Sequence, residues 1–396
     1  MSFAANPGGT LPPAQIYDRD ELTARLWRTL ARQSVYLSAE RRMGKTSVLR
    51  KMLVDPPPDV AVVACDLEKV ASPAELVEAL LQAINEKLPQ LLRARGALRR
   101  SLGGLGISKL SVTAIGSVEF RQSVEPQWST ALERVLHSLQ QVEAAYVVLF
   151  LDEVAYGLSS IARTTSPRDA QAILDHLRAA RQTDGRLRML YVSSIGLHHV
   201  LGEIGAGAGS WAPINDLLVE DVGPFTPHHA EGLARALIEG EAIPTVDPDA
   251  VAAAVANASD GVPYYIHHIV RRLLDRQPPI EASVVEEIVA QAIDDPYDAW
   301  GFEHYVTRLE AYYGDDAPLA GDMLDIVAVS GPLPFDRMLA LLSSRREVFE
   351  KDRDRVRRLT DVLQKDHYLV QEGDVLRFRL RLVARAWARR RHLGAP

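Results

Sequence analysis

Cysteine is nearly absent from the sequence, which has only Cys65 among 396 residues and therefore cannot close an internal disulfide. The sequence also lacks a run of about 18 apolar residues that could cross a membrane, and its N-terminus lacks the charged and then apolar pattern of a secretory signal. These absences exclude a disulfide-stabilised miniprotein and a membrane-spanning chain. We expect a protein of the reducing cytoplasm with no membrane partner.

The length is too great for one compact core, so we expect two or three domains. Hydrophobic residues make up 47% of the chain and charged residues 24%, which is typical of globular chains and excludes a disordered or collagen-like protein. The charge is unevenly distributed: residues 337–396 hold 16 Lys and Arg against 8 Asp and Glu, whereas the rest of the chain is acidic and the whole carries −7. An acidic body therefore ends in a basic tail.

Four apolar runs of strand length alternate with helical patterns, at residues 34–37, 60–66, 146–151 and 187–192. Strands buried on both faces and separated by helices imply a parallel sheet that is covered on both sides. We therefore predict a doubly wound α/β nucleotide-type domain over residues 16–225, after a flexible arm at 1–15. An alternating polar and apolar stretch near 108–121 predicts an inserted β-hairpin, to which we assign no role.

The strand pattern stops after residue 224. Helices expected at 227–239, 248–259, 263–274 and 283–293 predict a small helical lid domain, which with a connecting helix covers residues 226–316. Further helices at 318–329, 335–343 and 346–365, followed by a hairpin around residues 372–374, predict a winged-helix domain at 317–396.

The segment 39–46, with the sequence AERRMGKT, lies directly between a predicted strand and a predicted helix, where helix N–H groups point at a bound anion. In such a phosphate-binding loop Gly44 lets the backbone curl, Lys45 reaches the β- and γ-phosphates, and the Thr46 hydroxyl binds Mg²⁺. The full pattern begins with Gly, and Ala39 is the smallest replacement. The residues assigned to nucleotide binding are Ala39, Arg41, Arg42, Met43, Gly44, Lys45, Thr46 and Ser47; the alternative is an ordinary strand–helix turn.

The predicted strand 146–151 ends in two acids, Asp152 and Glu153. Because ligands bind at the carboxyl edge of open α/β sheets, we expect Asp152 to hold Mg²⁺ and Glu153 to polarise the attacking water. The alternative is that a strand reaching the surface simply ends in acids.

These motifs, together with the segment SSIGL at 193–197 and GVP at 261–263, resemble the AAA+-related ATPases of the archaeal-ATPase and STAND type. The resemblance covers about residues 16–390 in order. It implies a P-loop NTPase sheet with a helical lid and a C-terminal winged helix, which binds and hydrolyses Mg-ATP between core and lid. The nucleotide state would reposition the winged helix.

The resemblance also implies roles for single residues. Ser194, at the end of the fourth strand, would sense the γ-phosphate; the family usually has Gly where this chain has Ser193. Arg271 or Arg272 would act as a second sensor, although an exposed helix face explains either arginine at least as well. The residues implied to contact the adenine base are Ile16, Tyr17, Arg19 and Pro263.

A ring ATPase needs an arginine from a neighbouring subunit to neutralise the charge of the transition state. Arg178 and Arg181, on the helix before the fourth strand, are candidates for that role. STAND-type switches commonly lack this arginine and hydrolyse slowly, so self-assembly and a protein partner both stay open.

Arginines are concentrated at the C-terminus, where no acid follows Asp374. They alternate along the last predicted strand and continue into the last helix, as Arg377, Arg379, Arg381, Arg385, Arg389, Arg390 and Arg391. This stripe predicts binding to nucleic acid phosphates, or docking onto the acidic body of the same chain. The two hypotheses for function are a DNA-acting ATPase and a nucleotide switch in signalling or phage defence; a transcription factor with a vestigial nucleotide fold is a third.

Overall fold

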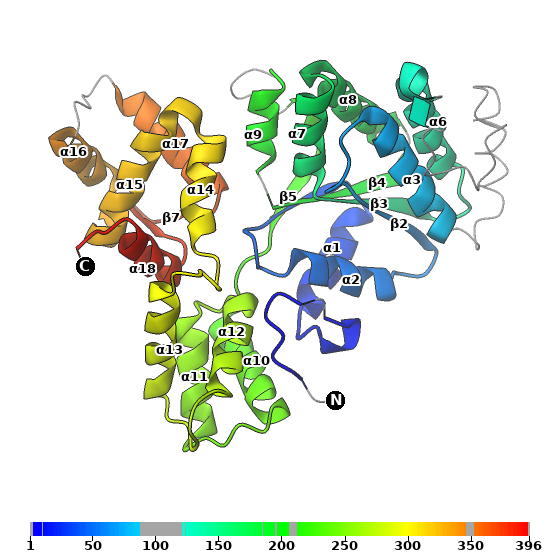
Figure 1. Cartoon of the computed structure of the whole chain (residues 1–396). Coiled ribbons are helices and arrows are strands. Elements are labelled where there is room, and N and C mark those ends of the chain that lie inside the picture. The colour runs from blue at the N-terminus through cyan, green and yellow to red at the C-terminus, as the bar shows by residue number, and fades with distance from the viewer. Residues whose placement is uncertain are drawn as a thin grey trace. The chain divides into compact units, whose positions relative to one another are not determined.

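The computed structural model describes residues 3–9, 11–87, 121–122, 124–183, 185–194, 196–205, 212–345 and 352–394. The hairpin expected near 108–121 lies, apart from Arg121, outside these residues. The chain divides into two compact units. The core unit comprises Asp18–Arg41 and Lys45–Val222, and the C-terminal unit comprises Met1–Tyr17, Arg42–Gly44 and Gly223–Pro396 (Figure 1).

The core unit is built on a parallel sheet of five strands in the order β2-β3-β4-β1-β5. Its strands are β1 (Val35–Ser38), β2 (Val60–Asp66), β3 (Tyr146–Asp152), β4 (Leu187–Ser193) and β5 (Leu218–Asp221). The parallel α/β sheet is thus confirmed, and the four predicted strands are present. The edge strand β5 was not predicted, because it has only four residues and its Leu218 and Val219 are exposed.

Helices cover both faces of this sheet, with α3, α6, α7 and α8 on one face and α1 and α2 on the other (Figure 1). Residues Val147 to Leu151 of β3 are at most 2% exposed, which explains the unbroken apolar run in that strand. The helices are α1 (Asp20–Leu30), α2 (Lys45–Val54), α3 (Pro73–Lys87), α6 (Trp128–Gln140), α7 (Val154–Thr164), α8 (Pro167–Thr183) and α9 (Leu197–Glu203), with short 3-10 turns η4 (Glu125–Gln127) and η5 (Ala212–Ile214).

The C-terminal unit contains a helical lid formed by α10 (Pro227–Gly240), α11 (Pro248–Ala258), α12 (Pro263–Leu273) and α13 (Ser283–Asp294). Three of these helices begin with proline, whose fixed φ suits the first helical turn. The carboxylate of Asp247 accepts from the backbone N–H groups of Asp249 and Ala250 and so caps α11. These bounds agree with the predicted helices to within a residue or so.

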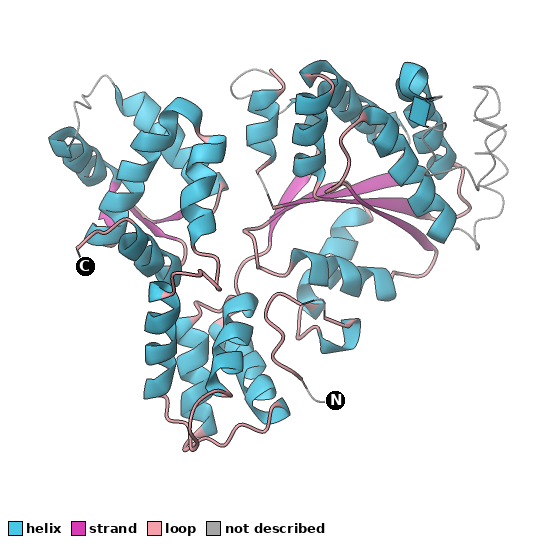
Figure 2. Cartoon of the chain, viewed as in Figure 1, coloured by secondary structure: helices cyan, strands magenta, loops and turns pink. Residues whose placement is uncertain are grey.

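A second set of elements follows the lid (Figure 2). They are α14 (Glu303–Tyr312), η6 (Gly314–Asp316), α15 (Ala317–Ser330), β6 (Leu333–Pro334), α16 (Phe335–Arg345), α17 (Arg353–Lys365), β7 (Leu369–Glu372), β8 (Val375–Phe378) and α18 (Arg381–Arg390). Strands β6, β8 and β7 form an antiparallel sheet, and Gly373 turns the hairpin with φ of +62°. We call residues 317–394 the C-terminal module; its order of elements is the one expected for a winged helix.

The first residues of the chain, expected as a flexible arm, pack in the C-terminal unit. The Phe3 ring meets the Tyr17 ring edge-on at 5.8 Å. The backbone N–H of Ala5 donates to the Glu241 carboxylate at 2.7 Å, and that of Asn6 donates to the His267 ring at 3.2 Å. Hydrogen-bond acceptors in the lid region, Glu241 and His267, thus hold this N-terminal segment in place, although its composition predicts a flexible arm.

Among the described residues, no helix combines the length and the apolar character that a membrane span requires.

Candidate nucleotide site

The predicted phosphate-binding loop lies between the end of β1 and the start of α2. The Lys45 ammonium is buried and donates to the carbonyl oxygens of Ala39 at 3.0 Å and Glu40 at 3.1 Å. Gly44 has a φ of +86°, a backbone conformation that a residue with a Cβ rarely adopts. The lysine therefore closes the loop on itself at the N-terminus of a helix, the place where a phosphate binds most readily.

The remaining loop residues differ in what they can offer a ligand. Thr46 is exposed in the first turn of α2 and Ser47 is half-buried beside it, so both hydroxyls lie next to helix N–H groups that have no intrahelical partner. The side chains of Ala39 and Met43 are buried, which leaves only their backbone for a ligand, and Arg41 is exposed.

Arg42, assigned to nucleotide binding from the sequence, has its side chain in the C-terminal unit. Its guanidinium lies over the Tyr264 ring at 4.3 Å and donates to the carbonyl oxygens of Trp300 and Gly301. Its φ is +78°, which costs a residue with a Cβ about 1 kcal/mol. These contacts give Arg42 a structural role that the motif did not predict.

Three acids gather at the carboxyl edge of the core sheet. Asp66 at the end of β2 is the register partner of Asp152 at the end of β3, and Glu153 follows directly. Burial and the charges of Glu153 and Asp66 raise the pKa of Asp152 to about 6, although a hydrogen bond from the Glu153 N–H and the charge of Lys45 oppose this rise. Because this cluster favours a positive charge, its oxygen donors fit Mg²⁺.

Glu153 and Ser194 are joined directly. The backbone N–H of Ser194 donates to Glu153 Oε2 at 3.0 Å, and the Ser194 hydroxyl donates to Oε1. Strands β3 and β4 are neighbours in the sheet, so the residues that follow them meet at its edge. Sequence analysis selected Glu153 and Ser194 as candidates but did not predict their contact. It also did not select Asp66, although this acid ends a predicted strand in the same way as Asp152.

Arg181 does not have the position expected of an arginine offered to a neighbouring subunit. Its guanidinium donates to both carboxylate oxygens of Asp216 at 2.7 Å and to the Tyr191 hydroxyl at 3.0 Å, and its side chain is 1% exposed. We correct that prediction: Arg181 is a buried structural residue. Arg178 is half-buried on the same helix, and its charge helps to lower the pKa of Asp216.

The residues implied to contact adenine lie partly together. In the C-terminal unit Ile16 is buried, and the Tyr17 ring meets the Phe225 ring edge-on at 6.2 Å. Pro263 begins α12 just after Gly261, where an added Cβ would lie 2.5 Å from the carbonyl oxygen of Phe225. Phe225 thus links the two segments that the resemblance picked out separately.

Two further candidates behave differently. In the core unit, burial lowers the pKa of Arg19 to about 10, although the charge of Asp18 opposes the shift. Arg271 is exposed and pairs with Asp275 one turn away at 3.5 Å, which supports an ordinary helix face rather than a sensor.

The arginine stripe of the C-terminal module is paired with acids of the same unit. Arg381 contacts Asp260 at 2.9 Å, Arg385 contacts Glu286, and Arg389 contacts Asp294. The other pairs are Arg390 with Asp298 and Glu303, Arg391 with Asp325, and Arg377 with Glu372, whereas Arg379 contacts the His367 ring. The sequence left two roles open for these arginines, namely binding to nucleic acid and docking onto acids of the same chain. The structure contains the contacts of the second role.

Comparisons with known proteins agree with this geometry. Residues 28–201 match the family model described as "AAA domain". The structure resembles the Walker-type ATPase PABY2304 of Pyrococcus abyssi, with 17% identity, a TM-score of 0.66, and coverage of 94% of this chain and 96% of that chain. A comparison with curated proteins finds no match.

Two other solved structures are similar over nearly the whole chain. The ORC2 protein of Aeropyrum pernix is 10% identical, with a TM-score of 0.49 over 98% of this chain and 97% of that chain. The RuvB Holliday junction branch migration motor of Thermotoga maritima is 10% identical, with a TM-score of 0.41 over 97% of each chain. The family match and the fold together give the class: residues 28–201 match the AAA domain, and the chain has a P-loop α/β fold similar to that of a Walker-type ATPase.

Proposed function

We propose that this chain binds Mg-ATP and hydrolyses it. The observation that carries the proposal is the Glu153–Ser194 contact beside Asp152, at the same sheet edge as a lysine-closed loop. A carboxylate held by two donors is fixed in orientation, as a general base must be to act on one water molecule. The alternative, a surface strand that simply ends in acids, gives no reason for Ser194 to donate to both oxygens of Glu153.

The phosphate and metal roles fall to residues of this edge. Lys45 and the N–H groups at the start of α2 bind the phosphates, with Thr46 and Asp152 as the residues that would hold Mg²⁺. Bound Mg²⁺ supplies charge neutralisation on the phosphate oxygens. Glu153 accepts the proton of the attacking water, and Ser194 keeps its carboxylate in place. Ile16, Tyr17 and Pro263 are the proposed contacts for the base.

The output of hydrolysis is a movement of the C-terminal module, which we propose acts as a winged helix on DNA or on a DNA-bound assembly. Its arginines would supply the phosphate contacts. A second function, a slowly hydrolysing switch with protein partners or copies of itself, is favoured by a specific observation. The α18 arginines already pair with lid acids, so DNA would have to displace those carboxylates.

The decisive experiment measures ATP binding and turnover for the full chain and two variants. Lys45→Ala should lose ATP binding, whereas Glu153→Gln should keep binding and lose turnover by about 100-fold or more. Lys51→Ala is the matched control, because Lys51 lies on the same helix but contacts Asp18 and Asp20. ATP binding that survives Lys45→Ala, or turnover that survives Glu153→Gln, would refute the proposal.

The same assay separates the two outputs. Turnover that rises with duplex DNA supports the DNA-acting ATPase. Tight ATP binding with negligible turnover and no response to DNA supports the switch. Turnover that climbs steeply with protein concentration identifies self-assembly.

A further inference from the structure

A cavity of about 730 Å³ lies within the C-terminal unit, and none of the residues proposed to bind the phosphates of ATP or Mg²⁺ lines it. It opens to solvent and is lined by lid helices α10 and α11 and by α15, β8 and α18 of the C-terminal module. Its volume is in the range of small-molecule sites. The cavity therefore has the size of a ligand pocket at a place to which the proposed ATPase reaction assigns nothing.

Small side chains keep this space open. Ala253 and Ala256 of α11 face it from the lid, and Ala384 and Ala388 of α18 face it from the module. Larger residues at these positions would let the two helices fill the gap by ordinary packing.

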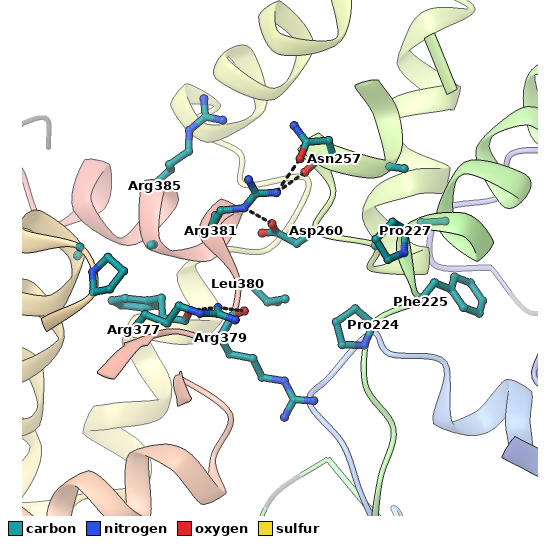
Figure 3. A pocket seen from close by; sticks show the side chains of 18 of the residues that line it. Pro224, Phe225, Pro227, Asn257, Asp260, Arg377, Arg379, Leu380, Arg381 and Arg385 are labelled. Atoms are coloured by element: carbon teal, nitrogen blue, oxygen red, sulfur yellow. Dashed lines mark hydrogen bonds and ion pairs between the residues drawn. The ribbon is translucent and has the colours of Figure 1, made fainter. Parts of the chain in front are cut away.

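The two walls of the cavity differ in chemistry, as Figure 3 shows. One wall is apolar and comes from the segment leading into α10, with Pro224, Phe225 and Pro227. The opposite wall comes from β8, α18 and the residues between them, and is basic. Four arginines line it, namely Arg377, Arg379, Arg381 and Arg385, against two carboxylates in the whole lining, Asp260 and Glu231.

The basic wall is held in place by its own contacts. Arg381 donates to Asp260 at 2.9 Å and to the side chain of Asn257 at 2.9 Å, and Arg377 donates to the carbonyl oxygens of Phe378 and Arg379. Guanidinium groups oriented before a ligand arrives lose little entropy on binding it.

We propose that this cavity binds a small amphipathic anion. Its flat apolar body lies against the Pro224 and Phe225 wall, and its carboxylate, sulfonate or phosphate faces the arginines. Arg377, Arg381 and Arg385 already pair with Glu372, Asp260 and Glu286, but each guanidinium has five N–H donors, so an anion can use the donors that these pairs leave. A cation would meet only two carboxylates in the lining, Asp260 and Glu231. The proposal does not rest on ATP hydrolysis, because the residues proposed for the phosphates and Mg²⁺ lie outside this lining.

The probe is anilinonaphthalenesulfonate, an aromatic anion, and Nile red serves as its neutral counterpart. Both are titrated into the full chain with fluorescence as the readout. Ala253→Phe and Ala384→Phe fill the cavity from opposite sides at half-buried positions, so each should weaken both dyes about tenfold or more. Arg379→Gln should weaken the anionic dye about tenfold and leave Nile red within twofold, because it removes the positive charge and the contact with the His367 ring but leaves the apolar wall unchanged.

Two controls locate the binding. Ala254→Phe, one residue along α11, faces a smaller neighbouring cavity and should leave both dyes unchanged. Lys45→Ala should also leave them unchanged, so failure of the ATPase proposal does not affect this test. Dye binding that persists in both cavity-filling variants overturns the site, and an equal loss of both dyes in Arg379→Gln overturns the preference for an anion. Aromatic carboxylates, sulfonates and phosphates that compete with the bound dye then show which of the three anionic groups the site prefers.

Discussion

Both donors of Ser194 point at the Glu153 carboxylate, the hydroxyl at one oxygen and the backbone N–H at the other, the latter at 3.0 Å. Glu153 itself has a φ of +52°, which turns the chain sharply between β3 and α7. Two donors on one carboxylate, at a turn that few residues adopt freely, fix the direction of that side chain. Orientation of the proposed base is thus built into the fold of the core unit.

Ser194→Ala removes the hydroxyl donor and keeps the backbone donor. We expect kcat to fall about tenfold because Glu153 becomes less well oriented, while the dissociation constant for ATP changes less than twofold. Ser194→Thr keeps a hydroxyl and should restore part of the rate. Steady-state turnover beside equilibrium ATP binding measures this; a weaker ATP affinity at unchanged kcat would assign Ser194 to binding instead.

The sequence predicted the strands that are apolar on both faces, and it missed β5, whose Leu218 and Val219 are exposed. It also predicted Glu153 and Ser194 as functional residues. The sequence could not predict the contact between Glu153 and Ser194. That contact requires β3 and β4 to be adjacent in the sheet, and an apolar run predicts a strand but not which strand lies beside it.

The partners of the charged residues were likewise not predictable from the sequence. The arginine stripe was evident, yet its partners were not, since a pattern of charges does not say which carboxylates lie opposite. Arg381 meets Asp260 from more than one hundred positions away in the chain. The prediction for Arg181 was wrong for the same reason, because no sequence motif identifies Asp216 as the partner of this buried arginine.

The Asp152 carboxylate is expected to lower the stability of the fold while serving the proposed Mg²⁺ site. Burial and two neighbouring carboxylates raise its pKa to about 6, so the charged form, which predominates at neutral pH, costs the folded chain stability relative to the unfolded chain. Asp152→Asn removes that charge and should stabilise the protein by roughly 1–3 kcal/mol while abolishing Mg²⁺-dependent ATP binding. Thermal unfolding without nucleotide, beside ATP binding with and without Mg²⁺, checks both parts. A lower Tm would show that the carboxylate makes favourable contacts that outweigh the repulsion.

Arg181 is buried and forms an ion pair with Asp216, whose side chain is 24% exposed. Arg181→Ala should cost about 1–3 kcal/mol of unfolding free energy, because it removes hydrogen bonds to Asp216 and Tyr191 while water partly screens the remaining carboxylate. Urea unfolding measures this loss. An arginine that acted on a neighbouring subunit would behave differently: its alanine variant would keep wild-type stability, lose turnover, and regain it when mixed with a Glu153→Gln chain.

His267 predicts how stability depends on pH. Burial lowers its pKa to about 4, below the usual 6.5, and its ring accepts from the Asn6 N–H, which requires the neutral form at that nitrogen. Between pH 6.5 and 4 the unfolded chain therefore binds more protons than the folded chain, so stability is present above pH 6.5 and is lost as the pH falls towards 4. His267→Gln should flatten that loss by a few kcal/mol in urea unfolding at stepped pH. An unchanged slope would assign the acid sensitivity to other groups.

The ion pairs of α18 decide whether its arginines can reach DNA. Arg381, Arg385 and Arg389 lie one turn apart, so they share a face, and each pairs with a different lid acid. The Arg385–Glu286 and Arg389–Asp294 pairs are exposed and worth about 0.2–1 kcal/mol each, whereas the Asp260 side chain is 10% exposed and also accepts from the Leu382 N–H at 2.7 Å. Neutralising the three acids together, as Asp260→Asn, Glu286→Gln and Asp294→Asn, frees three cations, with the larger stability cost at Asp260. If these arginines bind phosphates, the triple variant should bind duplex DNA up to about tenfold more tightly, with a steeper decline as salt increases. Fluorescence anisotropy at several salt concentrations measures both quantities. An affinity and salt slope equal to those of the wild type would show that the α18 arginines serve docking within the chain rather than DNA.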